Sequence, residues 1–319
     1  MRFVNTLALL LTLACGNAYA QGYPNKQVKM IVPFPPGGAT DIVARVVGQK
    51  LSEVWGQSVI IENRGGAGGN VGAIEAAKAA PDGYTLFFPS GSVVTANEHI
   101  YKNSPINPER DFVAVTNCAT GPQVLVVPAG SPYKSTKELI EAAKADPGKL
   151  TFGSAGIGSQ VHLAAESFVN TAGIDAIHVP YKGEGPALND LVGGQISFMV
   201  TNLAAAIGFV NQGRLRALGV TSKERAKQFP DIPAIAEALT GFENAGWFGI
   251  VAPAGTPKEI VDKVYRDTAK LLDTTEMRAR LYVLGMAPVG DRPEEFARYM
   301  KAERVRWAKV VRERKIEVK

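Results

Sequence analysis

The stretch MIVPFPPGGATDIVARVVGQKL, residues 30–51, decides the fold, because it leads from a buried strand into an amphipathic helix. The apolar residues before Pro33 predict the strand. Gly37 and Gly38 leave the backbone N–H groups at the helix start uncovered. Such N–H groups bind small anions, so this turn is a candidate anion site. The helix is predicted over residues 41–55, with one apolar face made of Val43, Val46, Val47, Leu51 and Val54.

Short apolar runs alternate with amphipathic segments along the rest of the chain, as in SVIIEN followed by NVGAIEAAKAA. This pattern predicts an α/β protein in which helices cover mostly parallel sheets. Two similar segments, LVVPAGSP at 125–132 and GIVAPAGTP at 249–257, indicate two similar lobes. We therefore expect one domain from residues 21–122 and 245–319, a second domain from residues 123–244, and two crossing strands between them.

A second glycine-rich turn, FGSAGIGSQVHL at residues 152–163, also follows a predicted strand and precedes a predicted helix. Ser154 and Ser159 add hydroxyl groups to it, and Gln160 and His162 lie in the first helical turn. Ligands of open α/β sheets bind in the crevice where such turns meet. If the two lobes face each other, both turns converge on one cleft, and a carboxylate fits that cleft.

Two residues of these turns also have a structural interpretation, which we favour. Asp41 is an acid at a helix start, where it stabilises its own helix. For His162, a packing or capping role is favoured over a contact with the ligand. A third glycine-rich turn, ENRGGAGGN at residues 62–70, is interpreted as mainly structural.

Motifs of the common enzyme classes are missing from the sequence. It has no GxxxxGK[ST] phosphate loop, no GxSxG nucleophile elbow and no dinucleotide fingerprint. The three histidines, His99, His162 and His178, lack a metal-ligand spacing. A secreted hydrolase that uses Ser154 and His162 is the remaining alternative, but no orienting acid accompanies these two residues. We expect a protein that is not an enzyme and that uses no cofactor and no metal.

The net charge of +5 comes from 35 basic and 30 acidic residues, and the basic excess lies in KAERVRWAKVVRERK near the C-terminus. No basic stripe with interleaved aromatic residues appears elsewhere. This pattern favours a solvated helix face over nucleic-acid binding.

The N-terminal sequence MRFVNTLALLLTLACGNAYAQG has the form of a secretory signal. Its apolar run is too short to span a bilayer, and AYA at residues 18–20 has the pattern of a cleavage site. We expect a signal peptide over residues 1–20, cleavage after Ala20 and a periplasmic protein. In the alternative, Cys15 stays as a lipid anchor. Otherwise Cys118 is the only cysteine, which excludes an intramolecular disulfide and predicts a buried thiol.

A series of ordered motifs resembles the Bug or TctC family, the periplasmic solute-binding proteins of tripartite tricarboxylate transporters. The motifs are IVPFPPGGATD, ENRGGAGG, PDGYTL, ERDF, GSAGIGSQVHLAAE, HVPYKG, LRALGVTS, PDIPAIAEA and WFGIVAPAGTP. The similarity runs from about residue 23 to the C-terminal helix. It implies a two-lobed Venus-flytrap fold of type II, in which each lobe is a mostly parallel sheet flanked by helices. The family usually has proline where this chain has Gly65, which loosens the third turn.

The resemblance also implies that a small carboxylate lies between the lobes, held by the two glycine-rich turns and ordered waters. Tyr181 in HVPYKG, Asn202 in FMVTN and Ser90 after YTLFFP are implied cleft residues, each with a structural hydrogen bond as the alternative. The implied ligand-binding set is Phe34, Gly37, Gly38, Ala39, Thr40, Asp41, Ser90, Ser154, Gly158, Ser159, Gln160, Val161, His162, Tyr181 and Asn202.

The partners expected from this resemblance are a small carboxylate and the membrane permease subunits of a tripartite transporter. An alternative partner is a receptor kinase that senses the ligand-bound form. We expect a monomer. The ligand class stays open between organic acids, acidic amino acids and aromatic acids.

Overall fold

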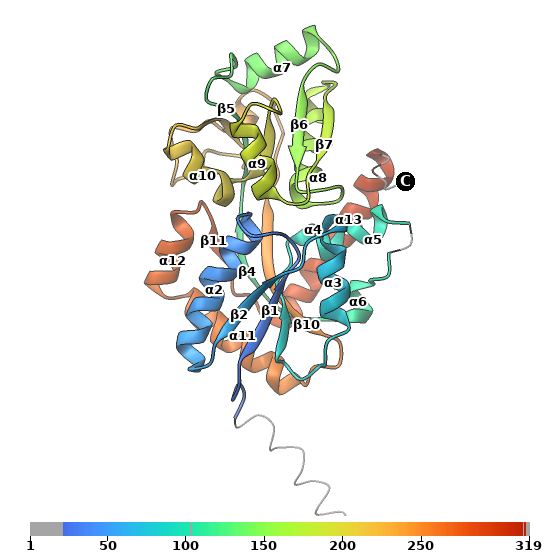
Figure 1. Ribbon diagram of the computed structural model, residues 1–319, viewed down its shortest axis with the longest axis vertical. Helices are drawn as coiled ribbons and strands as arrows, with labels where there is room; N and C mark the ends of the chain where they lie inside the picture. Colours follow the sequence, from blue (N-terminus) through green and yellow to red (C-terminus); the bar gives the residue numbers. More distant parts are fainter. Residues whose placement is uncertain (1–21, 103, 315, 317–319) are drawn as a thin grey trace, which may run out of the picture.

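The computed structural model describes residues 22–102, 104–314 and 316. It consists of two lobes stacked along the longest axis of the molecule (Figure 1). The predicted signal peptide and Cys15 lie outside the described residues.

The lower lobe in Figure 1 holds the first and the last parts of the chain. Its elements are β1 (Val28–Val32), α2 (Ala39–Trp55), β2 (Val59–Asn63), the 3₁₀ helix η1 (Ala67–Gly69), α3 (Asn70–Ala77), β3 (Thr85–Phe87), α4 (Gly91–Thr95), α5 (Asn97–Ile100), α6 (Pro108–Asp111), β4 (Phe112–Gly121), β10 (Gly246–Pro253), α11 (Lys258–Leu272), α12 (Thr275–Tyr282), β11 (Ala287–Pro288) and α13 (Pro293–Arg314). Its six strands form one sheet in the order β11-β4-β10-β3-β1-β2.

The upper lobe holds the middle of the chain (Figure 1). Its elements are β5 (Gln123–Pro128), α7 (Thr136–Ala145), β6 (Thr151–Ser154), α8 (Gln160–Ala172), β7 (Ile177–Pro180), α9 (Glu184–Val192), β8 (Met199–Asn202), α10 (Leu203–Asn211), β9 (Leu215–Val220) and the 3₁₀ helix η2 (Ile235–Glu237). Strands β8, β5 and β9 form one sheet, and β6 pairs with β7.

The α/β class and the two lobes are as predicted, but the strand directions are more mixed than the expected mostly parallel sheets. The pairs β1–β2, β1–β3 and β6–β7 are parallel, whereas β10–β3, β10–β4, β11–β4, β5–β8 and β5–β9 are antiparallel. The reason is the double crossing between the lobes. Strand β4 leads out of the lower lobe and β10 leads back into it, so these neighbours run in opposite directions.

The chain first crosses at Pro122, between β4 and β5, and returns through residues 221–245. In this return segment the Asn244 N–H donates to the Thr221 carbonyl oxygen at 2.9 Å. Each of the two similar PAG segments therefore follows a crossing, one at the end of β5 and one at the end of β10. Domain boundaries at 122/123 and 244/245 stay a prediction.

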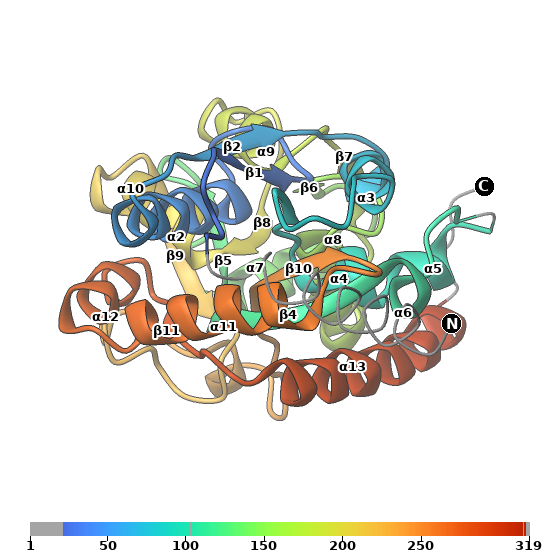
Figure 2. The same cartoon turned by 90° about the horizontal axis from the view of Figure 1, so that it is seen from below.

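Helices cover both faces of the lower sheet. Helix α2 packs beside α11 on one face, while α3, α4 and α13 lie on the other (Figure 2). Helix α2 buries Val43, Val47 and Leu51 as predicted, but Val46 is only partly buried and Val54 is 56% exposed. The burial thus stops at Leu51, one turn before the helix ends.

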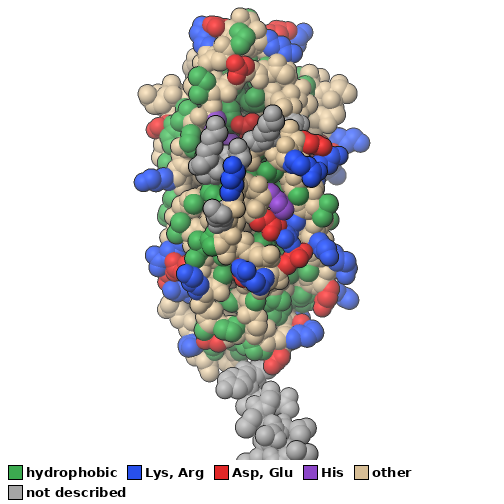
Figure 3. Space-filling model, turned by 90° about the vertical axis from the view of Figure 1, so that its right-hand side faces the viewer, with side chains coloured by type: hydrophobic (Ala, Val, Ile, Leu, Met, Phe, Trp, Pro, Cys, Tyr) green, Lys and Arg blue, Asp and Glu red, His purple; other side chains and the backbone are tan. Residues whose placement is uncertain are grey.

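One cluster of buried apolar side chains runs through both lobes and includes Val43 of α2 and Leu203 of α10. The lobes are therefore in close contact in this structure. Cys118 is buried in β4, as predicted, and its burial raises the pKa of the thiol. Among the described residues, no helix combines the length and the apolarity that crossing a membrane requires. Basic and acidic side chains are interspersed on the face drawn in Figure 3.

Candidate functional site: a cavity between the lobes

The turn before α2 is braced by its own acid. The Asp41 carboxylate accepts hydrogen bonds from the Gly37 N–H at 3.1 Å and from Asn63 Nδ2 at 2.9 Å. It also forms an ion pair with Arg45, one turn further along the helix. Asp41 is only 4% exposed and contacts its own lobe in all these interactions. The geometry supports the structural interpretation of Asp41.

The turn before α8 carries a helix cap and a close contact with the other lobe. Ser159 Oγ accepts a hydrogen bond from the His162 N–H at 3.3 Å, and the Gly158 N–H donates to His162 Nδ1 at 3.2 Å. Gly158 has φ +80°, and a Cβ there would lie 2.7 Å from Oδ1 of Asn97 in the lower lobe. Only glycine satisfies both the backbone conformation and this close approach.

Two histidines lie behind the α8 turn. The rings of His162 and His178 stack with centroids 4.1 Å apart, and Ser154 Oγ is 2.6 Å from His178 Nε2. Burial and the neighbouring His162 lower the pKa of His178 to about 4. His162 thus packs and caps, as the favoured interpretation predicted. The role of His178 was missed, because its partners come from a different strand and helix.

The same two histidines and Glu166 bring possible metal ligands within 4.8 Å of one another. The histidine spacing in the sequence does not predict this cluster, which only the fold assembles. The two imidazole planes are 27° apart, so their in-plane lone pairs run side by side and do not point to one position. His162 Nδ1 and His178 Nε2 already have hydrogen-bond partners. As arranged, the cluster does not offer a tetrahedral site.

The third glycine-rich turn closes against the second one across the lobes. Tyr101 of the lower lobe donates to the carbonyl oxygen of Ile157 at 2.8 Å, and a Cβ on Gly68 would lie 2.3 Å from the same oxygen. A Cβ on Gly65 would lie 2.8 Å from Cδ of Pro35. The small residue at position 65 therefore fits its direct packing against the first turn.

The first two turns converge on a small cavity between the lobes, of about 10 Å³. From the lower lobe it is lined by Phe34, Gly38, Thr40 and Ser90, and from the upper lobe by Ala155, Ser159, Gln160, Val161, Glu184 and Asn202. The predicted residues that do not line it are Gly37, Ala39, Asp41, Ser154, Gly158, His162 and Tyr181.

Tyr181 has a partner in its own lobe. Its hydroxyl donates to Asp190 Oδ2 at 2.8 Å, which corresponds to the structural alternative for this residue. Burial is the larger cause, and the hydrogen bond to Asp190 the smaller one, of a rise in the pKa of Tyr181 to about 12.

Polar side chains connect the lobes at the cavity. Gln160 Oε1 accepts from the Gly91 N–H of the lower lobe at 3.2 Å, and Gln160 Nε2 donates to Asn202 Oδ1 at 3.1 Å. Ser90 is 2% exposed, and its hydroxyl has no hydrogen-bond partner among the described residues. A buried hydroxyl without a protein partner is rare, so Ser90 is free to hydrogen-bond a ligand or a water.

Glu184 is the cavity residue that the sequence analysis missed, together with Ala155. Its carboxylate accepts a hydrogen bond from the Ala39 N–H at the start of α2, at 2.8 Å. A signal was present in the sequence, since KGEGP places an acid between two glycines where a strand leads into a helix.

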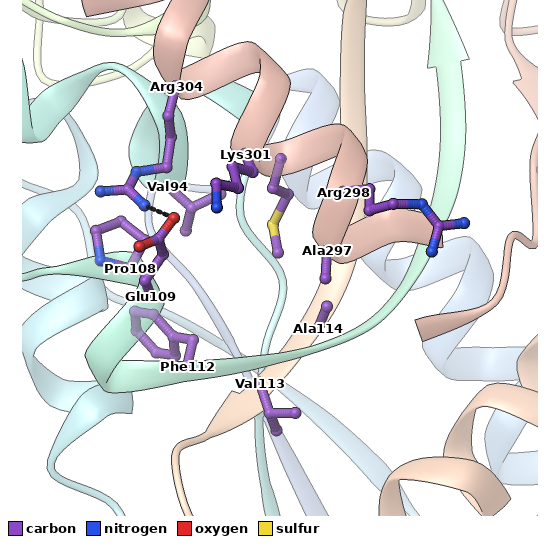
Figure 4. A pocket seen from close by; sticks show the side chains of 11 residues that line it. Val94, Pro108, Glu109, Phe112, Val113, Ala114, Ala297, Arg298, Lys301 and Arg304 are labelled. Carbon is purple, nitrogen blue, oxygen red and sulfur yellow. Dashed lines mark ion pairs between the residues drawn. The ribbon is translucent and has the colours of Figure 1, made fainter. Parts of the chain in front are cut away.

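A larger hollow of about 350 Å³ lies elsewhere, on the lower lobe beside α13 (Figure 4). Phe112 and Val94 contribute apolar surface, and Arg304 forms an ion pair with Glu109 at its edge. None of the turn residues lines this hollow. It therefore lies apart from the two glycine-rich turns that the sequence predicts as the ligand site.

Comparison with known proteins identifies the family. The profile of the "Tripartite tricarboxylate transporter family receptor", TctC, matches residues 43–316. This chain belongs to that family. The TctC/Bug proteins are periplasmic solute-binding proteins, which confirms the resemblance seen in the sequence.

Three relatives place the chain within the TctC/Bug family. Protein BugT of Bordetella pertussis is 37% identical over 296 residues, 92% of this chain and 91% of BugT. The structure of Rhodopseudomonas palustris Rpa4515 with adipate has a TM-score of 0.90 at 36% identity and covers 92% of this chain and 99% of that chain. MatC (Rpa3494) of the same organism, with bound malate, has a TM-score of 0.85 at 33% identity, over 91% of this chain and 100% of MatC.

Proposed function

We propose that this TctC/Bug protein captures a small carboxylate between its lobes and presents it to the membrane subunits of a tripartite transporter. The observation that carries the proposal is the small cavity where the α2 and α8 turns of different lobes converge. Its wall contains the Ser90 hydroxyl, which has no partner among the described residues. The two TctC/Bug structures named above contain adipate and malate, which are both small carboxylates.

The N-terminus of α8 is the proposed carboxylate position. Ser159, Gln160 and Val161 all line the cavity, and the first N–H groups of a helix have no partner within the helix. The helix dipole favours an anion there. Each hydrogen bond to a carboxylate contributes about 1.5–3 kcal/mol. The predicted ligand-binding residues of both turns, with Ser90 and Asn202, remain the proposed site.

Capture requires the lobes to move. A cavity of about 10 Å³ holds at most about one water molecule, so an organic acid enters only when the lobes separate. A ligand that contacts both lobes then stabilises the closed form by its differential affinity for that form. We propose the closed form as the state that the membrane subunits recognise, in the periplasm, with no covalent step.

A thermal-shift screen of residues 21–319 against carboxylates and their matched amides tests this proposal. Ligand that binds only the folded state stabilises it by roughly 2.7 kcal/mol at a hundredfold excess over Kd. We expect at least one acid to raise the melting temperature and its amide not to do so. The screen is repeated after unfolding and refolding, which removes any ligand retained from expression. No shift with any acid after refolding contradicts the proposal.

A further inference from the structure

Glu184 places a carboxylate of the protein itself in the wall of the ligand cavity. Its Oε1 accepts hydrogen bonds from Thr201 Oγ1 at 2.5 Å, from the Asn202 N–H at 2.8 Å and from Asn202 Nδ2 at 3.0 Å. All three donors belong to the upper lobe. They hold the side chain in one position whether or not the lower lobe is in contact.

The other carboxylate oxygen, Oε2, crosses to the lower lobe. It accepts the hydrogen bond from the Ala39 N–H, in the first turn of α2. A Cβ on Gly38 would lie 3.2 Å from Oε2, so a glycine there gives the carboxylate its access. The turn that the sequence predicts as an anion site therefore already receives an anion from the protein.

The hydrogen-bonding partners of Glu184 define its charge state. Burial raises the pKa of Glu184, and hydrogen bonds from Thr201, Ala39 and Asn202 oppose that rise. A protonated carboxyl needs an acceptor for its proton, and of these neighbours only the Thr201 hydroxyl can accept, because the Ala39 N–H, the Asn202 N–H and Asn202 Nδ2 only donate. Three of the four hydrogen bonds to the carboxylate therefore favour the ionised form against the effect of burial.

Two polar atoms of this wall have hydrogen-bonding capacity left for a ligand. Oε2 accepts one hydrogen bond from the described residues, and a carboxylate oxygen has room for two. Ser90, on the lower-lobe side of the same cavity, is only 2% exposed, and its hydroxyl has no partner in the described parts of the chain. A ligand atom that donates a hydrogen bond satisfies Oε2, whereas a second ligand carboxylate at this position meets a buried like charge.

We propose that Glu184 is a specificity-determining residue, which accepts a hydrogen bond from an ammonium or hydroxyl group of the ligand while the ligand's carboxylate lies at the N-terminus of α8. This inference rests on the proposed function and narrows it. The ligand class becomes amino acids and hydroxy acids, and a plain acid without a donor group binds more weakly.

Matched sets of acids test the inference on the wild-type protein by isothermal titration calorimetry. The sets are succinate, malate and aspartate; propionate, lactate and alanine; and glutarate, 2-hydroxyglutarate and glutamate. Within at least one set, we expect a donor-bearing acid to bind about tenfold or more tightly than its parent acid, the value of one hydrogen bond to a charged group. If every parent acid that binds does so as tightly as its donor-bearing partners, the inference is overturned.

The variant Glu184→Gln assigns the effect to this side chain. We expect the advantage of the ammonium-bearing acid to fall by about tenfold, because the carboxylate charge is lost. The advantage of the hydroxy acid falls less, since an amide oxygen still accepts from a hydroxyl. Glu141→Gln, the same change at an exposed position of α7, is the matched control and leaves both ratios unchanged.

The outcomes separate this inference from the proposed function. Acids that bind with the same ratios in Glu184→Gln as in the wild type overturn the role of Glu184 and leave carboxylate capture standing. Binding of no acid at all by the refolded wild-type protein overturns both. If Glu184→Gln does not fold, as judged by circular dichroism, the wild-type ratios decide alone.

Discussion

The α2 turn and the α8 turn are both glycine-rich turns before a helix, but they differ in their hydrogen-bond partners and in the residues that line the cavity. In the α2 turn, the Gly37 and Ala39 N–H groups are already bonded to Asp41 and Glu184. In the α8 turn, the Gly158 N–H is likewise bonded, to His162 Nδ1, but residues 159–161 line the cavity. The comparison supports the proposed carboxylate position at α8, because a helix N-terminus can bind a ligand only where its first N–H groups have no other partner.

Gly158→Val is expected to have the largest effect, because it combines backbone strain with a block to closure. The positive φ costs about 1–3 kcal/mol for a residue with a side chain. The new Cβ meets Asn97 across the lobes, so we expect carboxylate affinity to fall by about a hundredfold or more. Titration calorimetry measures this with the best acid of the screen.

Gly173→Val is the matched control for Gly158→Val, at the other end of the same helix. Gly173 also has a positive φ, +61°, but a Cβ added there would have no atom within 4 Å. The Gly173→Val variant should be less stable because of backbone strain, but its affinity for the carboxylate should be unchanged. Wild-type affinity in Gly158→Val would show that closure does not depend on this contact.

Gly38→Ala is expected to have an intermediate effect at the other turn. The added Cβ would lie 3.1 Å from Cβ of Glu184, which is tight without being prohibitive. Overpacking of this kind costs about 1–3 kcal/mol, so we expect affinity to fall by about tenfold. The melting temperature should change little, because φ of −86° suits alanine.

The double variant Gly38→Ala/Glu184→Gly tests whether Glu184 causes that loss, because only glycine removes the Cβ of residue 184. The penalty of the alanine at position 38 should disappear when the facing side chain is removed, which a double-mutant cycle measures. Gly208→Ala in α10, where nothing lies within 4 Å, is the control and should be neutral or slightly stabilising. A penalty that persists in the double variant would assign the clash to another neighbour.

His178→Gln is expected to have the smallest effect, on stability at low pH. The pKa of His178 is about 4 in the folded protein and about 6.5 in an unfolded chain. Between these values the unfolded state binds more protons, so the contribution of His178 is complete above pH 6.5 and is lost as the pH falls toward 4. Urea unfolding measures how far the free energy of unfolding falls between pH 7 and pH 4.5. This fall should be smaller in His178→Gln than in the wild type, by on the order of 1–2 kcal/mol.

Two features make this pH comparison specific. Glutamine can keep a hydrogen bond to Ser154 while removing the titrating ring, which also faces His162 and the partly buried Glu166. His99→Gln in the lower lobe controls for the loss of a histidine as such. If the free energy of unfolding falls equally in the wild type and in His178→Gln, other titrating groups cause the loss of stability at low pH.

The sequence by itself determined the local parts of this protein. Glycines at positions 37, 38 and 158, between apolar runs and amphipathic segments, were enough to predict the turns and the helices that follow them. The ordered motifs were enough to predict the TctC/Bug family. These features could be predicted because propensity, capping and glycine conformation depend on neighbours within a few residues.

The tertiary structure alone decided which of these parts meet. Strand direction depends on distant partners, so the antiparallel β4–β10 pair could not be predicted from alternation. Locally, Glu184 is an ordinary acid in the first turn of α9, and it becomes part of the cavity only because it contacts Ala39, 145 residues away. Likewise His178 of β7 meets His162 of α8 only through the stacking of their rings in the folded lobe. Contacts of this kind join residues far apart in the sequence, so a local pattern such as KGEGP can mark a candidate residue but not its partner.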